Sequence, residues 1–258
     1  MIYKGEILVS IPKIIHYCWF GEKDMPDLVK KCIKSWKKIL PDYEFKLWNE
    51  ENFDINSTKW TKVAYKNKKY AFVSDYVRLC ALLEFGGIYL DTDIRVKNSF
   101  NNLLNKDAFM GFECKDVLSA GVIGCHPNNE FIEECLEYYK NTRFDEENLN
   151  NNINAIMITN KLVRYGLKLD NSKQVVKNIH IYPKTYFNPM DFFGNWDKSD
   201  ETYCIHLYSG SWLPDEDYKR LARRKKLWWK IGKSIYIKIE NIKFINSIHK
   251  VLKKKDLV

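Results

Sequence analysis

Apolar side chains recur along this chain with two periodicities, one typical of strands and the other of helices. The first apolar run, residues 11–20, is rich in β-branched and aromatic residues, which favours a buried strand. Apolar residues then recur at spacings of three and four, which predicts a helix that begins near Pro26 and ends before Pro41. Alternation of apolar and polar positions over residues 43–47 predicts a second strand.

Segments with the two periodicities continue to alternate through the rest of the chain. Further helices are predicted near residues 60–67 and over residues 70–85, 127–140 and 153–165. Further strands are predicted over residues 88–90, 117–125, 179–182 and 203–208. Gly86 and Gly87 predict a left-handed cap after the helix over 70–85, and Pro127 is expected to open the next helix. Strands that alternate with helices predict an α/β sandwich with a mixed, mostly parallel sheet.

Two acids, Asp91 and Asp93, directly follow the short apolar strand over residues 88–90. Two carboxylates one residue apart at the edge of a sheet suit Mg²⁺ or Mn²⁺ held together with a diphosphate, because these ions are usually bound by one or two carboxylates plus substrate phosphates. An Asp-X-Asp triplet by itself occurs in many loops. The preceding Phe-Gly-Gly-Ile-Tyr-Leu run is what distinguishes this one.

Asp75 and Arg78 lie three residues apart on the helix that leads into the acidic pair, so they share one face. Beside a metal–diphosphate, Asp75 could bind sugar hydroxyls, and Arg78 could neutralise phosphate charge or Asp75 itself. The alternative is an ordinary intrahelical ion pair worth about 0.3–0.5 kcal/mol.

Three further candidates come from other parts of the chain. His206 ends an apolar strand, and its neutral imidazole could complete the coordination of the metal. Ser211 and Trp212 follow a glycine in a loop that could close over a bound diphosphate. Trp19, at the end of the first strand, could stack on a nucleobase. The alternatives are a structural histidine and tryptophans that only pack.

Composition narrows the class of protein. With 45% hydrophobic and 15% aromatic residues in 258, the chain has ample material for a core. Its seven cysteines form no Cys-X-X-Cys pair, which favours a reducing compartment and neither a disulfide framework nor a zinc site. We find no signal-peptide pattern and no apolar run near the roughly 20 residues of a spanning helix, so we expect a cytoplasmic protein.

The positive charge is concentrated at the carboxyl end. Residues 218–258 carry 14 Lys and Arg against 2 acids, a net charge of +12, so residues 1–217 sum to −3 out of the total of +9. Apolar residues recur there at helical spacing, which predicts a basic amphipathic tail after a catalytic domain over 1–217. Such a tail fits an anionic membrane surface, on the inner face of the membrane, or a helix packed on the domain.

Four blocks of residues resemble the family 32 glycosyltransferases, a DXD-containing family that includes yeast α-mannosyltransferases and bacterial capsule-synthesis proteins. The resemblance is more distant to the glucosyltransferase domain of large clostridial toxins. It covers about residues 11–213 and is carried by Ile11–His16 with Trp19-Phe20-Gly21, Ser74–Arg78, Gly86–Asp93, and His206 with Ser211-Trp212.

The resemblance implies a GT-A fold, a nucleotide-sugar donor, Mn²⁺ or Mg²⁺, and transfer with retention of configuration. It implies that Trp19 stacks on the base and that Asp75 and Arg78 hold the donor sugar. It further implies that Tyr89 and Asp91 face the ribose and the metal, that Asp93 and His206 bind the metal, and that Ser211 and Trp212 contact the diphosphate. The catalytic set is therefore Asp75, Arg78, Asp91 and Asp93.

The function expected is transfer of a hexose, from a UDP-hexose by preference or a GDP-sugar next, to a glycan or lipid-linked glycan in surface polysaccharide synthesis. A protein-modifying, toxin-like transferase and a metal-dependent nucleotide hydrolase remain alternatives. A basic membrane- or nucleic-acid-binding protein without catalysis is an alternative of another class. Because no nucleic-acid-binding motif is present and residues 1–217 are mildly acidic, no nucleic-acid partner is expected.

Overall fold

The computed structural model describes residues 10–191, 195–197 and 199–209. Ser211, Trp212 and the tail over residues 218–258 lie outside the described residues, and so does the expected domain boundary. In the part of the chain that the structure describes, every helix falls short of the length and apolar character needed to span a bilayer.

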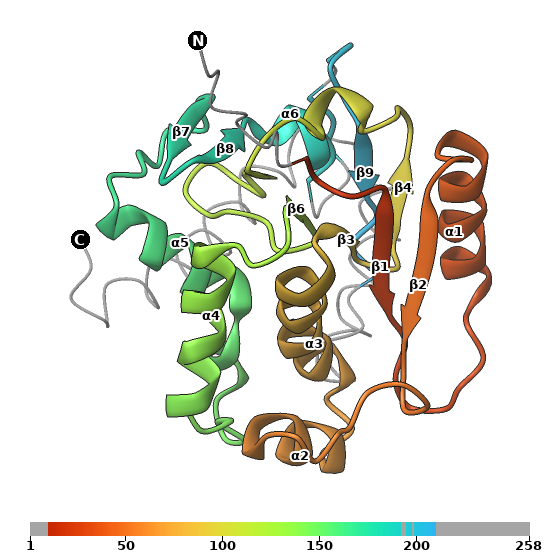
Figure 1. Ribbon diagram of the computed structural model, residues 1–258, viewed down its shortest axis with the longest axis vertical. Coiled ribbons are helices and arrows are strands. Elements are labelled where there is room, and N and C mark those ends of the chain that lie inside the picture. The colour runs from red at the N-terminus through yellow and green to blue at the C-terminus, as the bar shows by residue number, and fades with distance from the viewer. Residues whose placement is uncertain (1–9, 192–194, 198, 210–258) are drawn as a thin grey trace, which may run out of the picture.

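The helices and strands follow one another along the chain much as the alternation predicts (Figure 1). The helices are α1 (Asp27–Ile39), α2 (Lys59–Lys66), α3 (Tyr70–Phe85), α4 (Glu130–Asn141), α5 (Asn154–Arg164) and the short α6 (Lys184–Phe187), with 3-10 turns at Asn101–Leu103 and Leu149–Asn152. The strands are β1 (Ile14–Cys18), β2 (Glu44–Trp48), β3 (Gly87–Leu90), β4 (Ile94–Val96), β5 (Ala108–Gly111), β6 (Val122–Cys125), β7 (Gln174–Val176), β8 (Ile179–Tyr182) and β9 (Cys204–His206).

The main sheet has seven strands in the order β2-β1-β3-β6-β5-β8-β7. The pairings of β1 with β2, β1 with β3 and β5 with β8 are parallel, whereas β6 and β7 run against their neighbours, so five of the seven strands share one direction. The predicted mixed, mostly parallel sheet is thereby confirmed. A second, two-stranded sheet joins β4 to β9 and pairs Ile94 with His206.

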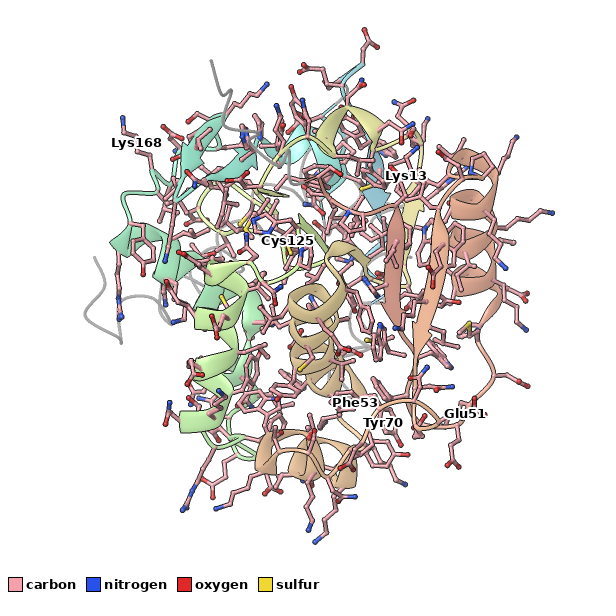
Figure 2. The ribbon with its side chains drawn as sticks, viewed as in Figure 1. Lys13, Glu51, Phe53, Tyr70, Cys125 and Lys168 are labelled. Atoms are coloured by element: carbon pink, nitrogen blue, oxygen red, sulfur yellow. The ribbon has the colours of Figure 1, made fainter. Side chains whose placement is uncertain are left out.

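Two apolar clusters lie on opposite faces of the main sheet. Alternation along β3 sends Tyr89 into the cluster beneath α2 to α5, and sends Ile88 and Leu90 into the cluster that α1 covers. The α3 and α4 helices, on the same face of the sheet, pack against each other (Figure 1). Side chains fill the space between the layers, and Cys125, buried there, is unpaired like the other six cysteines (Figure 2). The molecule is thus a three-layer sandwich in which an interior strand of the main sheet, β3, leads to the acidic pair.

Two predicted boundaries of secondary-structure elements are wrong. The strand expected over residues 117–125 is only β6, because residues 119–121 turn so that the Ser119 hydroxyl accepts the Gly121 N–H at 3.2 Å. The α4 helix is opened by Asn129 instead of Pro127, because the Asn129 side chain accepts the N–H groups of Phe131 and Ile132. The alternation also gave no signal for the short strands β4, β5 and β7.

The two glycines after α3 have positive φ angles, but Gly86 is not the predicted left-handed cap. Its φ of 62° is combined with a ψ of −155°, the mirror image of an extended conformation, which glycine adopts readily and which turns the chain directly from α3 into β3. A Cβ on Gly86 would lie 2.6 Å from the Pro127 nitrogen, and one on Gly87 would lie 2.7 Å from the Ile14 carbonyl oxygen. Both glycines are therefore needed for close packing as well as for the turn.

A buried histidine fixes the same junction. The His16 Nε2 donates to the Gly86 carbonyl at 2.8 Å, and Nδ1 accepts from the Trp48 indole N–H at 3.2 Å. Burial lowers the pKa of His16 to about 4, although the hydrogen bond to Gly86 opposes this shift. His16 is therefore a neutral residue that ties β1 and β2 to the start of β3.

Candidate functional site

The site begins at the carboxyl end of β3, where Asp91 leaves the sheet. The Asp91 N–H donates to the Gly121 carbonyl at 2.9 Å, and the Asp91 carbonyl accepts the Ile94 N–H at 3.0 Å. The Tyr89 hydroxyl donates to Asp91 Oδ1 at 3.0 Å. Backbone and side-chain hydrogen bonds therefore fix both the position and the orientation of this carboxylate.

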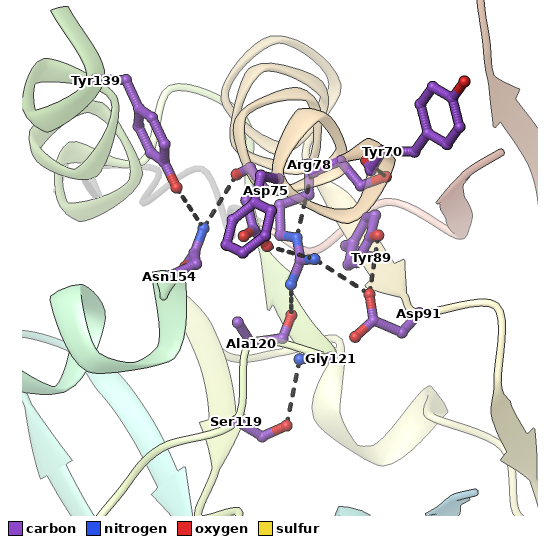
Figure 3. Close-up of polar contacts among 12 residues, drawn as sticks. Tyr70, Asp75, Arg78, Tyr89, Asp91, Ser119, Ala120, Gly121, Tyr139 and Asn154 are labelled. Carbon is purple, nitrogen blue, oxygen red and sulfur yellow. Dashed lines mark hydrogen bonds and ion pairs between the residues drawn. The ribbon is translucent and has the colours of Figure 1, made fainter. Parts of the chain in front are cut away.

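The Arg78 guanidinium lies between two carboxylates (Figure 3). Its Nη2 is 2.8 Å from Asp75 Oδ1 and 3.2 Å from Asp91 Oδ1, while its Nη1 donates to the Ala120 carbonyl at 2.6 Å. The guanidinium also lies over the Tyr89 ring, 4.5 Å from its centroid. Asp75 and Arg78 are thus part of a buried network that includes the first acid of the pair, and the simple intrahelical ion pair is excluded.

Burial makes the protonation of Asp75 unusual. Loss of water raises the pKa of Asp75 to about 7; Arg78 opposes the rise and Asp91 adds to it. Burial alone would lower the pKa of Arg78, but Asp91, Tyr89 and Asp75 together raise it above its usual range. Burial therefore leaves Asp75 able to exchange a proton near neutral pH, even beside a permanently charged guanidinium.

The second acid, Asp93, is bound by the segment around β9. The Asp93 Oδ1 is 3.2 Å from His206 Nε2, and Oδ2 accepts the Ser209 N–H at 2.7 Å. The Asp93 carbonyl accepts the Leu207 N–H at 3.0 Å. The antiparallel pairing of β4 with β9 thus delivers residues from the end of the described chain to the acidic pair.

Charge separation within this group is strong. Burial alone would lower the pKa of His206, but Asp93, Asp91 and Glu113 together raise it to about 9. Burial alone would raise the pKa of Asp93, but His206 and the Ser209 N–H hold it below its usual range. The His206 ring stacks on Tyr208 with centroids 4.1 Å apart, and its Nδ1 is buried without a hydrogen-bond partner in the described ranges.

Asp91, Asp93 and His206 could hold a divalent metal. Each offers one ligand atom, and these atoms lie within 4.8 Å of one another. Two carboxylate oxygens and one imidazole nitrogen suit Mn²⁺ or Mg²⁺. The space beside them depends on a glycine, because a Cβ on Gly121 would lie 2.9 Å from Asp91 Oδ2 and 3.5 Å from His206 Cε1.

The predicted site residues fall into two groups that share Asp91. The first consists of Asp75, Arg78, Tyr89 and Asp91, and the second of Asp91, Asp93 and His206. Trp19 follows β1 at the same edge of the sheet, because β1 and β3 are parallel, and its indole N–H donates to the Lys23 carbonyl at 2.6 Å. Within the described residues no hydrogen bond or ring contact joins Trp19 to either group.

Sequence reasoning missed the loop that faces both groups. Ala120 and Gly121 contribute the carbonyls that hold Arg78 and Asp91. Glu113, in the same loop, is close enough for its pKa to respond to His206, Asp91 and Asp93. The only local signal for this loop is the run of small residues at 119–121 between apolar ones.

Residues 26–110 match the family described as "Glycosyltransferase sugar-binding region containing DXD motif". An uncharacterized glycosyltransferase of Acanthamoeba polyphaga mimivirus is 24% identical over 219 residues, which cover 79% of this chain and 84% of the relative. Inositol phosphoceramide mannosyltransferase 3 of Schizosaccharomyces pombe is 30% identical over 139 residues, 51% of this chain and 39% of the relative.

The fold resembles a solved glycosyltransferase, PaToxG. The TM-score is 0.50 at 22% sequence identity, and the match covers 60% of this chain and 69% of that one. The GT-A prediction for the fold is thereby confirmed. The matched family region, residues 26–110, includes both groups of the site apart from His206.

Proposed function

We propose that this chain, whose residues 26–110 match the DXD-containing glycosyltransferase sugar-binding family, transfers a hexose from a nucleotide-sugar donor with the help of a divalent metal. The observation that carries the proposal is the junction of the two groups at Asp91, which contacts Arg78 and belongs to the candidate metal set. The chain spans 39% of the yeast mannosyltransferase it matches, so that protein's substrates enter only as candidates.

Each residue has a task that follows from its contacts. Asp75, with its raised pKa, binds donor-sugar hydroxyls, and Arg78 adds positive charge beside the departing diphosphate. Asp91, Asp93 and His206 would hold Mn²⁺ or Mg²⁺, which as a Lewis acid neutralises that diphosphate. In this proposal Trp19 stacks on the base, Tyr89 faces the ribose, and Ser211 with Trp212 contacts the diphosphate.

Retention of configuration is proposed to follow a same-face route. The bond from the anomeric carbon to the diphosphate oxygen breaks, and its electron pair leaves with the diphosphate. The acceptor oxygen bonds to the same face of the carbon, and its proton passes to a phosphate oxygen of the leaving group. The support is that Arg78 pairs with Oδ1 of both Asp75 and Asp91, which makes these two carboxylates poorer nucleophiles toward the sugar.

The experiment is a panel of UDP- and GDP-sugars with Mn²⁺, scored by nucleotide release and by donor-induced thermal stabilisation. We expect a UDP-hexose to respond best, with a GDP-sugar next and mannose a candidate sugar in view of the yeast relative. Asp93→Asn should abolish both responses because it removes a ligand and the partner of His206. Asp170→Asn, at an exposed turn, is the matched control. A full response from folded Asp93→Asn would contradict the metal assignment.

The same panel distinguishes the rival metal-dependent nucleotide hydrolase. A hydrolase releases nucleotide and free sugar at an unchanged ratio when acceptors are added. A transferase instead converts the sugar into a glycosylated product, which mass spectrometry detects.

The acceptor proposed is a glycan or a lipid-linked glycan in surface polysaccharide synthesis, with a protein acceptor as the alternative. Residues 218–258, with their net charge of +12, would bring the enzyme to an anionic membrane surface. We expect the full-length protein to sediment with liposomes that contain anionic lipid, and a truncation after Asp217 to remain in the supernatant. Equal sedimentation of the two proteins would remove the membrane role.

A further inference from the structure

A hairpin-like loop after β5 carries a carboxylate that the proposed chemistry does not use. Phe112 and Leu118 form an isolated antiparallel bridge, and the Glu113 N–H donates to the Val117 carbonyl at 2.8 Å. The same loop ends at Ala120 and Gly121, whose carbonyls bind Arg78 and Asp91. Glu113 therefore belongs to a loop that is anchored to the site at its other end.

The alternation of side chains in β5 predicts the direction of Glu113. Ala108, Met110 and Phe112 pack in the cluster beneath α3 and α4, whereas Phe109 packs in the opposite cluster. Glu113 continues the row of Phe109, on the side where β4 and β9 contribute Ile94 and Cys204. Burial is the largest influence on the pKa of Glu113 and raises it. His206 lowers this pKa, and Asp91 and Asp93 raise it, so the Glu113 carboxyl lies near all three side chains.

The Glu113 carboxylate is partly buried and has no hydrogen bond or ion pair with any described side chain. Loss of water around such a carboxylate costs stability, and no contact within the described ranges gives it a structural role. Glu113 is also absent from the set of groups whose ligand atoms lie within 4.8 Å of one another, which contains only Asp91, Asp93 and His206 of the described residues. It therefore faces the candidate metal site without belonging to its direct ligands.

We infer that Glu113 is an acceptor-binding residue, whose carboxylate accepts hydrogen bonds from hydroxyls of a polyhydroxylated acceptor, a sugar or a polyol. The inference rests on the proposed transferase function. In a same-face route the acceptor enters beside the leaving diphosphate, and this is the side that Asp91, Asp93 and His206 occupy. A carboxylate at that position can accept hydrogen bonds from two hydroxyl groups, which orients the attacking oxygen.

The test uses the full chain, the donor identified by the panel, and three probe acceptors: methyl α-glucoside, methyl α-mannoside and myo-inositol. Glu113→Gln should lower kcat/KM for the best probe about 10- to 100-fold, mainly through KM, because a hydrogen bond to a charged group is lost. Release of nucleotide to water and the affinity for Mn²⁺ should stay within about twofold of wild type. Glu44→Gln, an exposed glutamate on the edge strand β2, should behave as wild type throughout.

A second readout is stability. Glu113→Gln should raise the thermal midpoint, since it removes an unpaired, partly buried charge, and Glu113→Asp should show an intermediate loss of transfer. Unchanged transfer by Glu113→Gln, a loss of Mn²⁺ affinity as large as that of Asp93→Asn, or a sugar trapped covalently on Glu113 would each overturn the inference. Wild-type protein that turns over the donor but glycosylates none of the probes overturns it as well. Wild-type protein that turns over no donor overturns the proposed function itself.

Discussion

At the scale of single residues, Arg78 is the group on which most other contacts depend. It is 4% exposed, yet it neutralises Asp75 and Asp91 and binds the Ala120 carbonyl. Only a guanidinium has enough donors in one plane to make these contacts together. Removal of the cation would leave two carboxylates close together without compensation.

Arg78→Met should therefore destabilise the protein by about 3–5 kcal/mol, the usual cost of removing one partner from a buried ion pair. Arg78→Lys keeps the charge but loses the planar set of donors, so its stability should lie between those of Arg78→Met and wild type. Urea unfolding at neutral pH measures both. Lys177→Met, which breaks the partly exposed pair with Glu134, should cost no more than about 1 kcal/mol. Equal losses for Arg78→Met and Lys177→Met would show that the Arg78 network adds little to stability.

At the scale of elements, glycines decide how closely segments approach the site. The backbone angles of Gly121 are ones that other residue types also adopt, but its lack of a side chain leaves room for Asp91 and His206. Gly166, after α5, has a φ of 95° and open space around it. The first glycine is needed for the site, and the second is needed for the turn.

This contrast yields a paired prediction. Gly121→Ala should fold with nearly normal stability but lose most Mn²⁺ binding and nucleotide release, because its Cβ would displace the Asp91 carboxylate. Gly166→Ala should lose about 1 kcal/mol of stability and keep Mn²⁺ affinity and turnover. Thermal unfolding and calorimetric titration with Mn²⁺ measure the two effects. Normal Mn²⁺ affinity in Gly121→Ala would mean that Asp91 moves aside without functional cost.

At the scale of the whole molecule, β3 lies between the two apolar clusters, so its carboxyl end is surrounded by well-packed structure on both faces. The neutral histidine at its start is part of that packing. The site thus lies at the end of an interior strand of the main sheet, and its geometry depends on the intact sheet. Acid should disturb both together.

The pH dependence of stability follows from His16. The unfolded imidazole is protonated below about pH 6.5, whereas the folded one has a pKa of about 4. Between these pH values the unfolded state binds more protons than the folded state, so the free energy of unfolding rises with pH. It is about 3 kcal/mol greater above pH 6.5 than below pH 4.

The contribution of Asp75 to stability changes with pH in the opposite direction. Its pKa is raised from the ordinary value of 3.8 to about 7 in the folded state, so its contribution falls as the pH rises between these values. The measurement is therefore a comparison of wild type with His16→Gln by urea unfolding from pH 4 to pH 7. The difference in unfolding free energy should shrink as the pH falls. A difference that does not change with pH would show that folding does not lower the pKa of His16.

The fold was largely predictable from the sequence. Helices α1, α3 and α5 and strands β1, β2, β3 and β8 lie where the apolar pattern places them, because each has enough residues to show its period. The three-residue strands β4 and β7 are too short to show a period and form because a neighbouring strand supplies hydrogen bonds. The start of β6 is set by the contacts that Ala120 and Gly121 make with Arg78 and Asp91, which come from other parts of the chain.

The sequence alone determined what is local: the acidic pair after a buried strand, the three-residue spacing of Asp75 and Arg78, and the two glycines between helix and strand. Only the tertiary structure decided which distant groups meet there. Asp93 and the Ser209 N–H are 116 residues apart, and Glu113 reaches the same place from another strand. The physical reason is that helical and strand periods depend on neighbours in sequence, whereas these meetings depend on strand order and register, which the packing of the whole sheet selects.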